Sequence, residues 1–351
     1  MAQASLPAQR PVEEEPAAAP RGRPLHALGR ELRDHLPIWF VYVEAIGLLH
    51  AALANFPAES FAAVGIPRER FVPTIAFPLV WFVVYFALRL RARPGPRRWA
   101  AALVAVAALG VPLLVTFGYV RHPLRHGQLT ALFEVMQFCW VAVFLVQIGL
   151  TRGRWALLEF FGVTLCYGLI LENTGIVMRY FYEPSFRVYL GPLPAPLATM
   201  LGWSLVFYVV ISVVEQLGGW WPWLARGPGR QALAATALAL CLDAQLDPMA
   251  SMSGVFWRWN DKLPPGFLGV PLVNFAAWFG AFLPYSWFLF RLRARPDLTP
   301  RQRNWELFLR VPLAAGLGGA LCFAVMALLE GGVRGPTFQV LAEFSRRLLP
   351  Y

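Results

Sequence analysis

Hydrophobic residues in this chain are gathered into long runs separated by short polar stretches. A helix needs about 20 apolar residues to cross the hydrocarbon core of a bilayer, and each run approaches that length. The pattern therefore predicts an all-α protein, a polytopic transmembrane helix bundle of about eight to nine helices. The expected spans are residues 36–55, 72–91, 98–119, 129–150, 154–175, 193–215, 230–247, 269–290 and 309–330.

The composition agrees with a membrane protein, because 58% of the residues are hydrophobic and only 15% are charged. Soluble domains contain roughly 45–50% apolar and 25% charged residues. The net charge of +11 comes mainly from arginines in the short connections between apolar runs. This placement is typical of membrane topology and does not indicate a nucleic-acid partner. It favours a cytoplasmic N-terminus, and we expect a multi-pass protein of the cell (inner) membrane.

Three regions are expected along the chain. Residues 1–35 are rich in Ala, Pro, Arg and Glu and lack an apolar core, which predicts a disordered cytoplasmic tail and no cleaved signal peptide. Residues 36–330 are expected to form one multi-helix membrane domain, and residues 331–351 a short C-terminal tail. The four cysteines show no metal-ligand spacing and are interpreted as packing residues.

Carboxylates at membrane depth are the most informative residues, because an ionisable group there is costly and needs a partner. Glu159 lies near Arg152 and Arg154, which predicts an ion pair at the membrane boundary. Glu44 lies in mid-span with no partner visible in the sequence. The other polar residues of this kind approach one, non-cytoplasmic end of their expected helices: Glu134, Glu172, Asp243, Asp247 and Asn274.

Asp243 and Asp247 are four residues apart, so they share one helix face about 6 Å apart along its axis. Two like charges this close in a low dielectric do not both ionise, and one carboxyl is expected to keep its proton. An acid beside a carboxylate is an arrangement used in general acid–base chemistry. A structural role stays open for each residue. Asp247 would cap the turn at Pro248, which is expected to end or kink the helix, and Asp243 would bond a backbone carbonyl or an arginine.

Aromatic residues supply a second signal. Trp257 and Trp259 in GVFWRWN, and Tyr180 and Tyr182 in RYFYEP, alternate along segments expected on the non-cytoplasmic side. Anchoring at the membrane interface explains most aromatic residues in a membrane protein. Beside buried acids, aromatic faces also stabilise a cation through their quadrupole.

Several motifs occur in order along the chain: ENTG (172–175), RYFYEP (179–184), LGPLPAPL (190–197), GW (202–203), LDAQLDP (242–248), GVFWRW (254–259) and FLGVPLVNFAAW (267–278). Over residues 130–290 the chain resembles the carotenoid biosynthesis protein family, which includes membrane hydratases of the bisanhydrobacterioruberin hydratase type. The resemblance implies a hydro-lyase that adds water to the terminal double bond of a linear carotene. Residues of these motifs complete the candidates for substrate binding: Asn173, Trp203, Asn274 and Trp278.

This reaction suits acids near one interface, because a linear carotene is about as long as the bilayer is thick. Protonation of the terminal alkene would give a tertiary carbocation, which aromatic faces would stabilise before water adds. Asp247 or Glu172 would donate the proton, Asp243 would tune the donor or orient water, and Asn274 would form hydrogen bonds within the site. We expect no metal or redox cofactor, a linear carotenoid or isoprenoid lipid as substrate, and the lipid bilayer as surroundings.

Two alternatives to a hydratase stay open. An intramembrane prenyltransferase would use the D-x-x-x-D pattern of DAQLD with magnesium and an isoprenoid diphosphate, although the sequence has no second aspartate-rich motif. A non-enzymatic carotenoid-binding protein or a transporter would keep the aromatic residues and tolerate loss of the acids. An iron-dependent desaturase is disfavoured, because it needs clustered histidines and the chain has five, with His122 and His126 as the only close pair.

Overall fold

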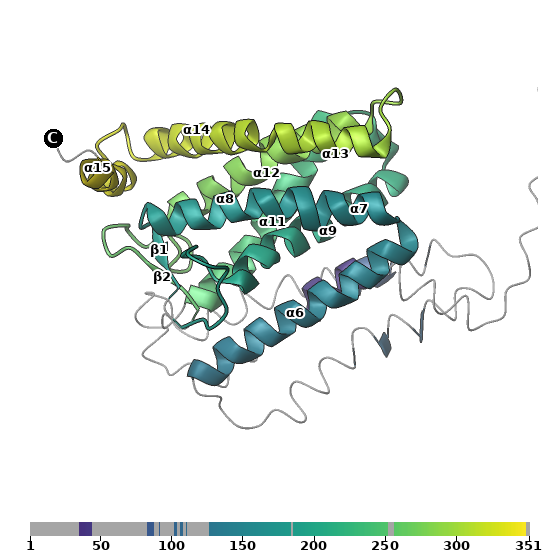
Figure 1. Cartoon of the computed structure of the whole chain (residues 1–351), viewed down its shortest axis with the longest axis horizontal. Helices are drawn as coiled ribbons and strands as arrows, with labels where there is room; N and C mark the ends of the chain where they lie inside the picture. The colour runs from purple at the N-terminus through teal and green to yellow at the C-terminus, as the bar shows by residue number, and fades with distance from the viewer. Residues whose placement is uncertain are drawn as a thin grey trace, which may run out of the picture.

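The computed structural model describes residues 35–43, 83–87, 91, 102–103, 106–107, 110, 126–183, 185–251 and 256–348. These residues are mostly helical (Figure 1), which confirms the expected all-α class. In chain order the elements are α6 (His126–Thr151), α7 (Arg154–Leu158), η1 (Glu159–Val163), α8 (Thr164–Val177), β1 (Phe181–Tyr182), α9 (Leu197–Trp220), α10 (Pro222–Ala225), α11 (Pro228–Ser251), β2 (Arg258–Trp259), α12 (Leu272–Arg293), α13 (Pro300–Leu309), α14 (Val311–Leu329) and α15 (Pro336–Leu348).

Five helical segments among the described residues are long and apolar enough to cross a membrane: Gly127–Thr151, Arg154–Val177, Leu197–Trp220, Leu272–Arg293 and Val311–Leu329. They coincide with five of the expected spans, and α11 coincides with a sixth, residues 230–247. The expected spans 36–55, 72–91 and 98–119 lie largely outside the described residues. Glu44, His122 and nearly all of the tail expected over residues 1–35 also lie outside them.

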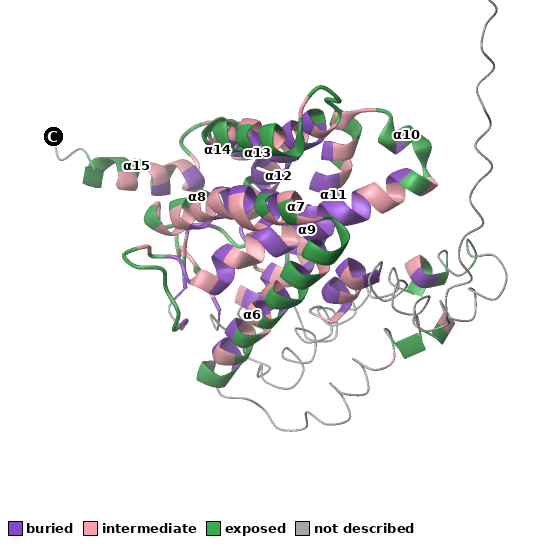
Figure 2. Ribbon diagram, turned by 45° about the vertical axis from the view of Figure 1, so that its right-hand side comes forward, coloured by how far each residue is buried: buried purple, intermediate pink, exposed green. Residues whose placement is uncertain are grey.

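Helix α9 lies at the centre of the described bundle and has the largest buried share of the five spans. It packs against α6, α8 and α11, while α12 packs against α11 and α14. Helices α6 and α14 carry long exposed faces on the outside (Figure 2). Because these exposed faces are themselves apolar, the surroundings that suit them are lipid.

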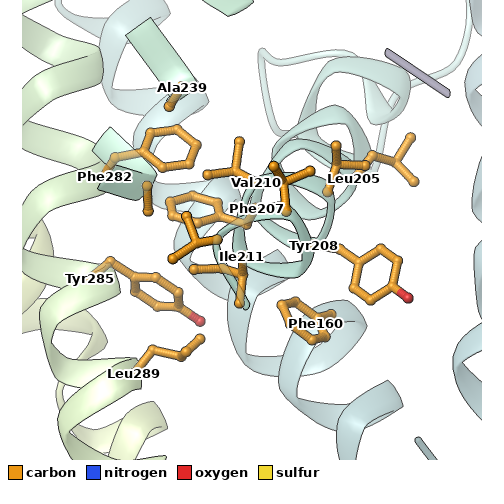
Figure 3. Close-up of a cluster of buried hydrophobic side chains, with 14 of the residues drawn as sticks. Phe160, Leu205, Phe207, Tyr208, Val210, Ile211, Ala239, Phe282, Tyr285 and Leu289 are labelled. Atoms are coloured by element: carbon orange, nitrogen blue, oxygen red, sulfur yellow. The ribbon is translucent and has the colours of Figure 1, made fainter. Parts of the chain in front are cut away.

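Aromatic rings from α8, α9 and α12 pack together in the middle of the bundle. Figure 3 shows the rings of Phe207, Phe282 and Tyr285 among aliphatic side chains of α9 and α12. The rings of Phe207 and Phe282 stack with centroids 4.0 Å apart, and those of Tyr167 and Tyr285 stack at 4.5 Å. Each buried tyrosine hydroxyl has a partner, since Tyr167 donates to the Ala281 carbonyl at 2.8 Å and Tyr285 shares a 2.7 Å hydrogen bond with a threonine of α8. Stacked and satisfied rings hold the three helices in a fixed relation.

Helices α12 and α14 approach each other most closely at two glycines. A Cβ built on Gly280 would lie 2.2 Å from the Gly318 carbonyl oxygen, and one built on Gly318 would lie 2.5 Å from the Gly280 carbonyl oxygen. Small residues allow such close helix packing in membrane proteins. The contact fixes the distance between two helices that line the cavity described below.

The short strands and α15 lie at one end of the bundle, on the left in Figure 1. Strand β1 pairs antiparallel with β2, with Phe181 opposite Trp259. The Tyr180 hydroxyl donates to the Thr337 carbonyl of α15 at 3.0 Å, and Val340 of the same helix is buried. The segment expected to be a short C-terminal tail therefore contains a helix that packs on the bundle.

The other end of α12 carries an ion-pair network. Arg293 pairs with Glu159 and with Glu215, and Arg152 pairs with Glu215 at 2.7 Å. The predicted pairing of Glu159 with Arg152 or Arg154 is therefore wrong, because Arg152 is engaged by Glu215 and Arg154 lies over a tryptophan ring. A partner 134 residues away in sequence, on α12, takes the place of the local one.

Candidate active site

A cavity of about 530 Å³ lies beside the paired strands and reaches into the bundle. Its walls come from α6, α8, α9, α11, α12 and α14, and most of its lining residues are apolar. Along α12 it extends from Val273 to Ala281, a rise of about 12 Å at 1.5 Å per residue. A cavity of this size, apolar with a few placed polar groups, is typical of a small-molecule site.

Most of the candidate residues predicted from the sequence meet at this cavity. Those that line it are Glu172, Tyr180, Trp203, Asp247, Trp257, Trp259, Asn274 and Trp278. Asp243 is fully buried next to the lining, where it contacts Asn274. Asn173 and Tyr182 do not line the cavity.

The positions of these two outlying residues have local causes. Asn173 holds the loop before α9, since its side chain accepts a hydrogen bond from the Ala195 amide at 3.1 Å. Tyr182 is 41% exposed, although it was expected on the same side as Tyr180. The alternation does not extend to both tyrosines, because β1 spans only Phe181–Tyr182 and Tyr180 lies before it.

Asn274 joins the two aspartates of α11. Its Nδ2 donates to Asp243 Oδ1 and Oδ2 at 3.1 and 2.9 Å, and to Asp247 Oδ2 at 2.6 Å. The residue lies in the first turn of α12, after Pro271, so its side chain faces the end of α11. The structural roles left open for Asp243 and Asp247 are therefore not the ones found, because both carboxyls accept from an amide that itself lines the cavity.

Of the two outcomes expected at Pro248, an end of the helix is wrong, because α11 continues past this proline to Ser251. Proline removes one N–H donor, and in the last turn of a helix this deprives a single carbonyl of its partner. Ser251 adds a bond in the same turn, because its Oγ donates to the Asp247 carbonyl at 2.6 Å. The extra turn keeps Asp247 in a helical position, on the same face as Asp243.

Glu172 enters the cavity from α8. The indole Nε1 of Trp203 donates to its Oε2 at 2.6 Å, and the Trp203 ring lies 4.8 Å from that of Trp278. The glycine of the ENTG motif leaves room beside it, since a Cβ on Gly175 would lie 2.3 Å from the Phe181 ring. An acid, an indole donor and two aromatic faces therefore share one wall of the cavity.

Glu183 lies behind this wall, against Glu172, and was not among the candidates predicted from the sequence. It lies in the loop after β1 yet is only 7% exposed, and the Thr199 hydroxyl donates to its Oε2 at 3.4 Å. Burial raises the pKa of the Glu183 carboxyl well above its usual value, and the neighbouring Glu172 and Asp247 raise it further. In the sequence, a glutamate between Tyr182 and a proline is typical of an exposed loop. The only signal for a role in the site is its position in the RYFYEP motif, beside the aromatic residues predicted to bind substrate.

Four carboxyl groups thus lie together: Glu172, Glu183, Asp243 and Asp247, hereafter the carboxyl cluster. None of the ion pairs between described residues includes any of them. Glu134 is different, because its Oε1 accepts the backbone amides of Arg187 and Val188 at 3.0 and 2.9 Å. It fastens the loop and takes no part in the cluster.

The chain matches the model of the carotenoid biosynthesis protein family over residues 129–340, which is more than half of its 351 residues. This protein belongs to the carotenoid biosynthesis protein family. No curated protein and no solved structure shows a significant match to it. The matched region extends beyond the core expected over residues 130–290 and reaches into α15.

The whole carboxyl cluster lies within the matched region, so the site and the family assignment concern the same part of the chain. Its role lies in carotenoid biosynthesis. Carotenoids are long, apolar and unsaturated, and the cavity of this carotenoid biosynthesis protein offers apolar walls, aromatic faces and buried acids. Buried acids facing a C=C bond are suited to proton transfer.

Proposed function

We propose that this carotenoid biosynthesis protein is an integral-membrane hydratase that adds water to the terminal double bond of a linear carotene. The observation that carries the proposal is that Glu172 and Asp247 face one apolar, aromatic-walled cavity while no described cation pairs with either carboxyl. Burial without a counter-ion disfavours the charged form of a carboxyl, so protons stay in the site. The five apolar helices support a substrate that reaches this cavity from the bilayer.

The donor pattern divides the acids into two roles. The Asn274 amide donates to Asp243 and to Asp247, and such donors stabilise negative charge on this pair. Glu172 receives a single N–H, from the Trp203 indole, and its other neighbour is the Glu183 carboxyl instead of a second donor. We therefore assign Glu172 as the acid and Asp247 as the base.

The reaction then proceeds in two steps. The π electrons of the terminal alkene take the proton from the Glu172 carboxyl, forming a C–H bond and leaving a tertiary carbocation. A water oxygen attacks the cation, and the proton released from that water passes to the Asp247 carboxylate. Return of this proton to Glu172 resets the site, so the net change is addition of one water, and no electrons are exchanged. Asp243 and Asn274 hold Asp247 in place throughout.

Aromatic faces stabilise the intermediate cation. Trp203 and Trp278 lie beside the acid, and Trp257 and Trp259 form a second aromatic group on the cavity wall. A cation over an aromatic face gains about 2 kcal/mol when desolvated. The walls also limit the access of water, so that a single ordered molecule adds and other nucleophiles do not.

A prenyltransferase is less well supported by the same residues. Its D-x-x-x-D carboxylates would have to bind magnesium, whereas here Asn274 occupies three of the four oxygens of Asp243 and Asp247. A diphosphate also needs cationic side chains, and the described residues that line the cavity include no lysine or arginine. The geometry therefore favours an uncharged substrate.

The test is expression of the full chain in cells that accumulate lycopene, followed by liquid chromatography and mass spectrometry of the pigments. We expect a gain of one water per modified end. Asp247→Asn and Glu172→Gln should each lower hydration by about 10²–10⁴-fold, the usual contribution of a general acid or base. Glu134→Gln is the matched control, since its remaining amide oxygen still accepts the two loop amides.

Three results would argue against a hydratase. Unmodified pigment with well-expressed protein contradicts hydration of lycopene, and magnesium-dependent release of diphosphate would support the prenyltransferase. Carotene that copurifies unchanged with both the wild type and Asp247→Asn would indicate a binding protein.

A further inference from the structure

The carboxyl cluster contains a group that the proposed steps do not use. Glu183 does not line the cavity, yet it is buried to more than nine tenths and lies against Glu172, which does. Its Oε1 receives no hydrogen bond from any described donor. A buried carboxyl oxygen without a donor is costly, and loops rarely place one against a second carboxyl without compensation.

A proton between the two glutamates removes this cost. If one carboxyl is protonated, its O–H donates to the other and satisfies the oxygen that lacks a donor. Trp203 donates to Glu172 Oε2 at 2.6 Å. The Thr199 hydroxyl lies 3.4 Å from Glu183 Oε2 and 3.0 Å from the Pro196 carbonyl, so its single proton is shared between two acceptors. Glu183 Oε1 is thus the oxygen that lacks a donor among the described residues, and a proton held between the two carboxyls would satisfy it.

We propose that Glu183 is a positioning residue that shares one proton with Glu172 and thereby keeps Glu172 loaded as the acid of the site at neutral pH. The role in catalysis rests on the proposed hydratase function. The sharing of the proton does not, because it follows from the contact between the two carboxyls.

The surroundings of Glu183 support this assignment. The titratable groups that face it are Glu172 from α8, Asp247 from α11 and Tyr189 from its own loop, whose hydroxyl donates to the Glu183 carbonyl at 3.3 Å. Helix α9 contributes only the neutral hydroxyl of Thr199. No described cation offsets a negative charge here, so loss of the shared proton would leave two buried anions in contact.

The arrangement also accounts for how the loop is built. Glu134 of α6 holds the loop from outside through two backbone amides. Asn260 holds the preceding turn by two hydrogen bonds. Its side-chain amide donates to the Arg179 carbonyl at 2.8 Å, and its backbone N–H donates to the Tyr180 carbonyl at 3.0 Å. Bonds on both sides of Glu183 fix the backbone that carries it, which a carboxyl held against another carboxyl requires.

The first experiment compares pH profiles of carotene hydration for the wild type, Glu183→Gln and Glu134→Gln. A glutamine amide stabilises the ionised form of Glu172 by donating to it, and it cannot share a proton. Glu183→Gln should therefore lose at least about tenfold in rate at neutral pH, recover toward the wild type in acid, and show its alkaline limb at lower pH by about one unit or more. Glu134→Gln should keep the wild-type profile.

The second experiment does not need catalysis. Infrared spectra of the purified full chain in detergent, recorded in water and in heavy water over a pH series, report protonated carboxyl groups directly. We expect a carboxyl band in the wild type that persists to neutral pH and is lost or shifted to lower pH in Glu183→Gln and in Glu172→Gln, but kept in Glu134→Gln.

The outcomes separate the two proposals. An unchanged infrared band in Glu183→Gln overturns the shared proton even if hydration occurs. A changed band in a protein that hydrates no carotene keeps the shared proton and overturns the hydratase. A uniform loss of rate at every pH, with the band unchanged, would reduce Glu183 to a structural residue.

Discussion

Replacement of Asn274 by alanine is the sharpest test of how the carboxyl cluster is held together. The amide has two N–H groups and makes three contacts of 2.6 to 3.1 Å with Asp243 and Asp247. A hydrogen bond to a charged group contributes about 1.5–3 kcal/mol. Because Asn274 borders the cavity and water replaces part of the lost bonding, we expect a loss of about 3 kcal/mol in the free energy of unfolding.

The assay is thermal unfolding of the purified protein in detergent, paired with hydration in lycopene-accumulating cells. A loss of about 3 kcal/mol corresponds to a fall in Tm of roughly 5–10 °C for a chain of a few hundred residues. Hydration should fall by about 10²-fold, because Asp247 loses the donor that orients it. Asn304→Ala is the matched control, since that buried side chain donates to a neutral carbonyl, that of Trp155, at 2.8 Å. Asn304→Ala should lower the free energy of unfolding by about 1 kcal/mol and leave the rate of hydration unchanged.

A double-mutant cycle tests whether the charge of the aspartates accounts for the stability lost in Asn274→Ala. In a chain that carries Asp243→Asn and Asp247→Asn, the further change Asn274→Ala should cost only about 1 kcal/mol, because the bonds it removes are then neutral. Equal losses of stability in Asn274→Ala and Asn304→Ala, or an undiminished cost in the cycle, would refute the view that the amide holds an ionised carboxyl in this pair.

Three further substitutions test other parts of the structure. Gly280→Ala should lower the free energy of unfolding by about 1–3 kcal/mol, because its Cβ would lie 2.2 Å from the Gly318 carbonyl oxygen. Gly319→Ala is the control, since its Cβ would meet nothing within 4 Å, and this variant should unfold like the wild type in a thermal scan. Trp203→Phe keeps the ring but loses the N–H donated to the acid of α8, so hydration should drop about tenfold with normal expression, and an unchanged rate would show that this bond is dispensable. Arg293→Met leaves Glu159 without an ion-pair partner and leaves Glu215 paired with Arg152 alone, so it should lower the free energy of unfolding by about 3 kcal/mol. A variant that unfolds like the wild type in a thermal scan would show that the network does not stabilise the fold.

The helices and part of the site follow from local sequence patterns. Apolar runs long enough to span a bilayer predict α6, α8, α9, α12 and α14, because membrane helices satisfy their backbone hydrogen bonds internally and need no distant partner. The spacing of Asp243 and Asp247 places them on one helix face whatever the rest of the fold does. The grouping of Asn274 with them follows from the levels at which the expected helices begin and end.

What the sequence could not predict depends on contacts between distant segments. Glu159 finds its partner on α12, far along the chain, because three-dimensional packing brings Arg293 nearer than the local arginines. Glu183 is buried only because the loop folds under α9 and against α8, which no local pattern records. Tyr182 was expected to share the side of Tyr180, but the strand that the alternation presumed includes only Phe181 and Tyr182, and Tyr182 is exposed.

The tryptophans of the cavity have an optical consequence. Of the 14 in the chain, Trp203, Trp257, Trp259 and Trp278 line the cavity, where they would lie against a bound polyene. A conjugated polyene absorbs light in the region where indole emits, so a bound carotenoid would quench the fluorescence of these tryptophans by energy transfer. We therefore expect the emission of the purified protein to fall when the proposed carotenoid substrate is added, which would follow occupancy of the site without any attached label.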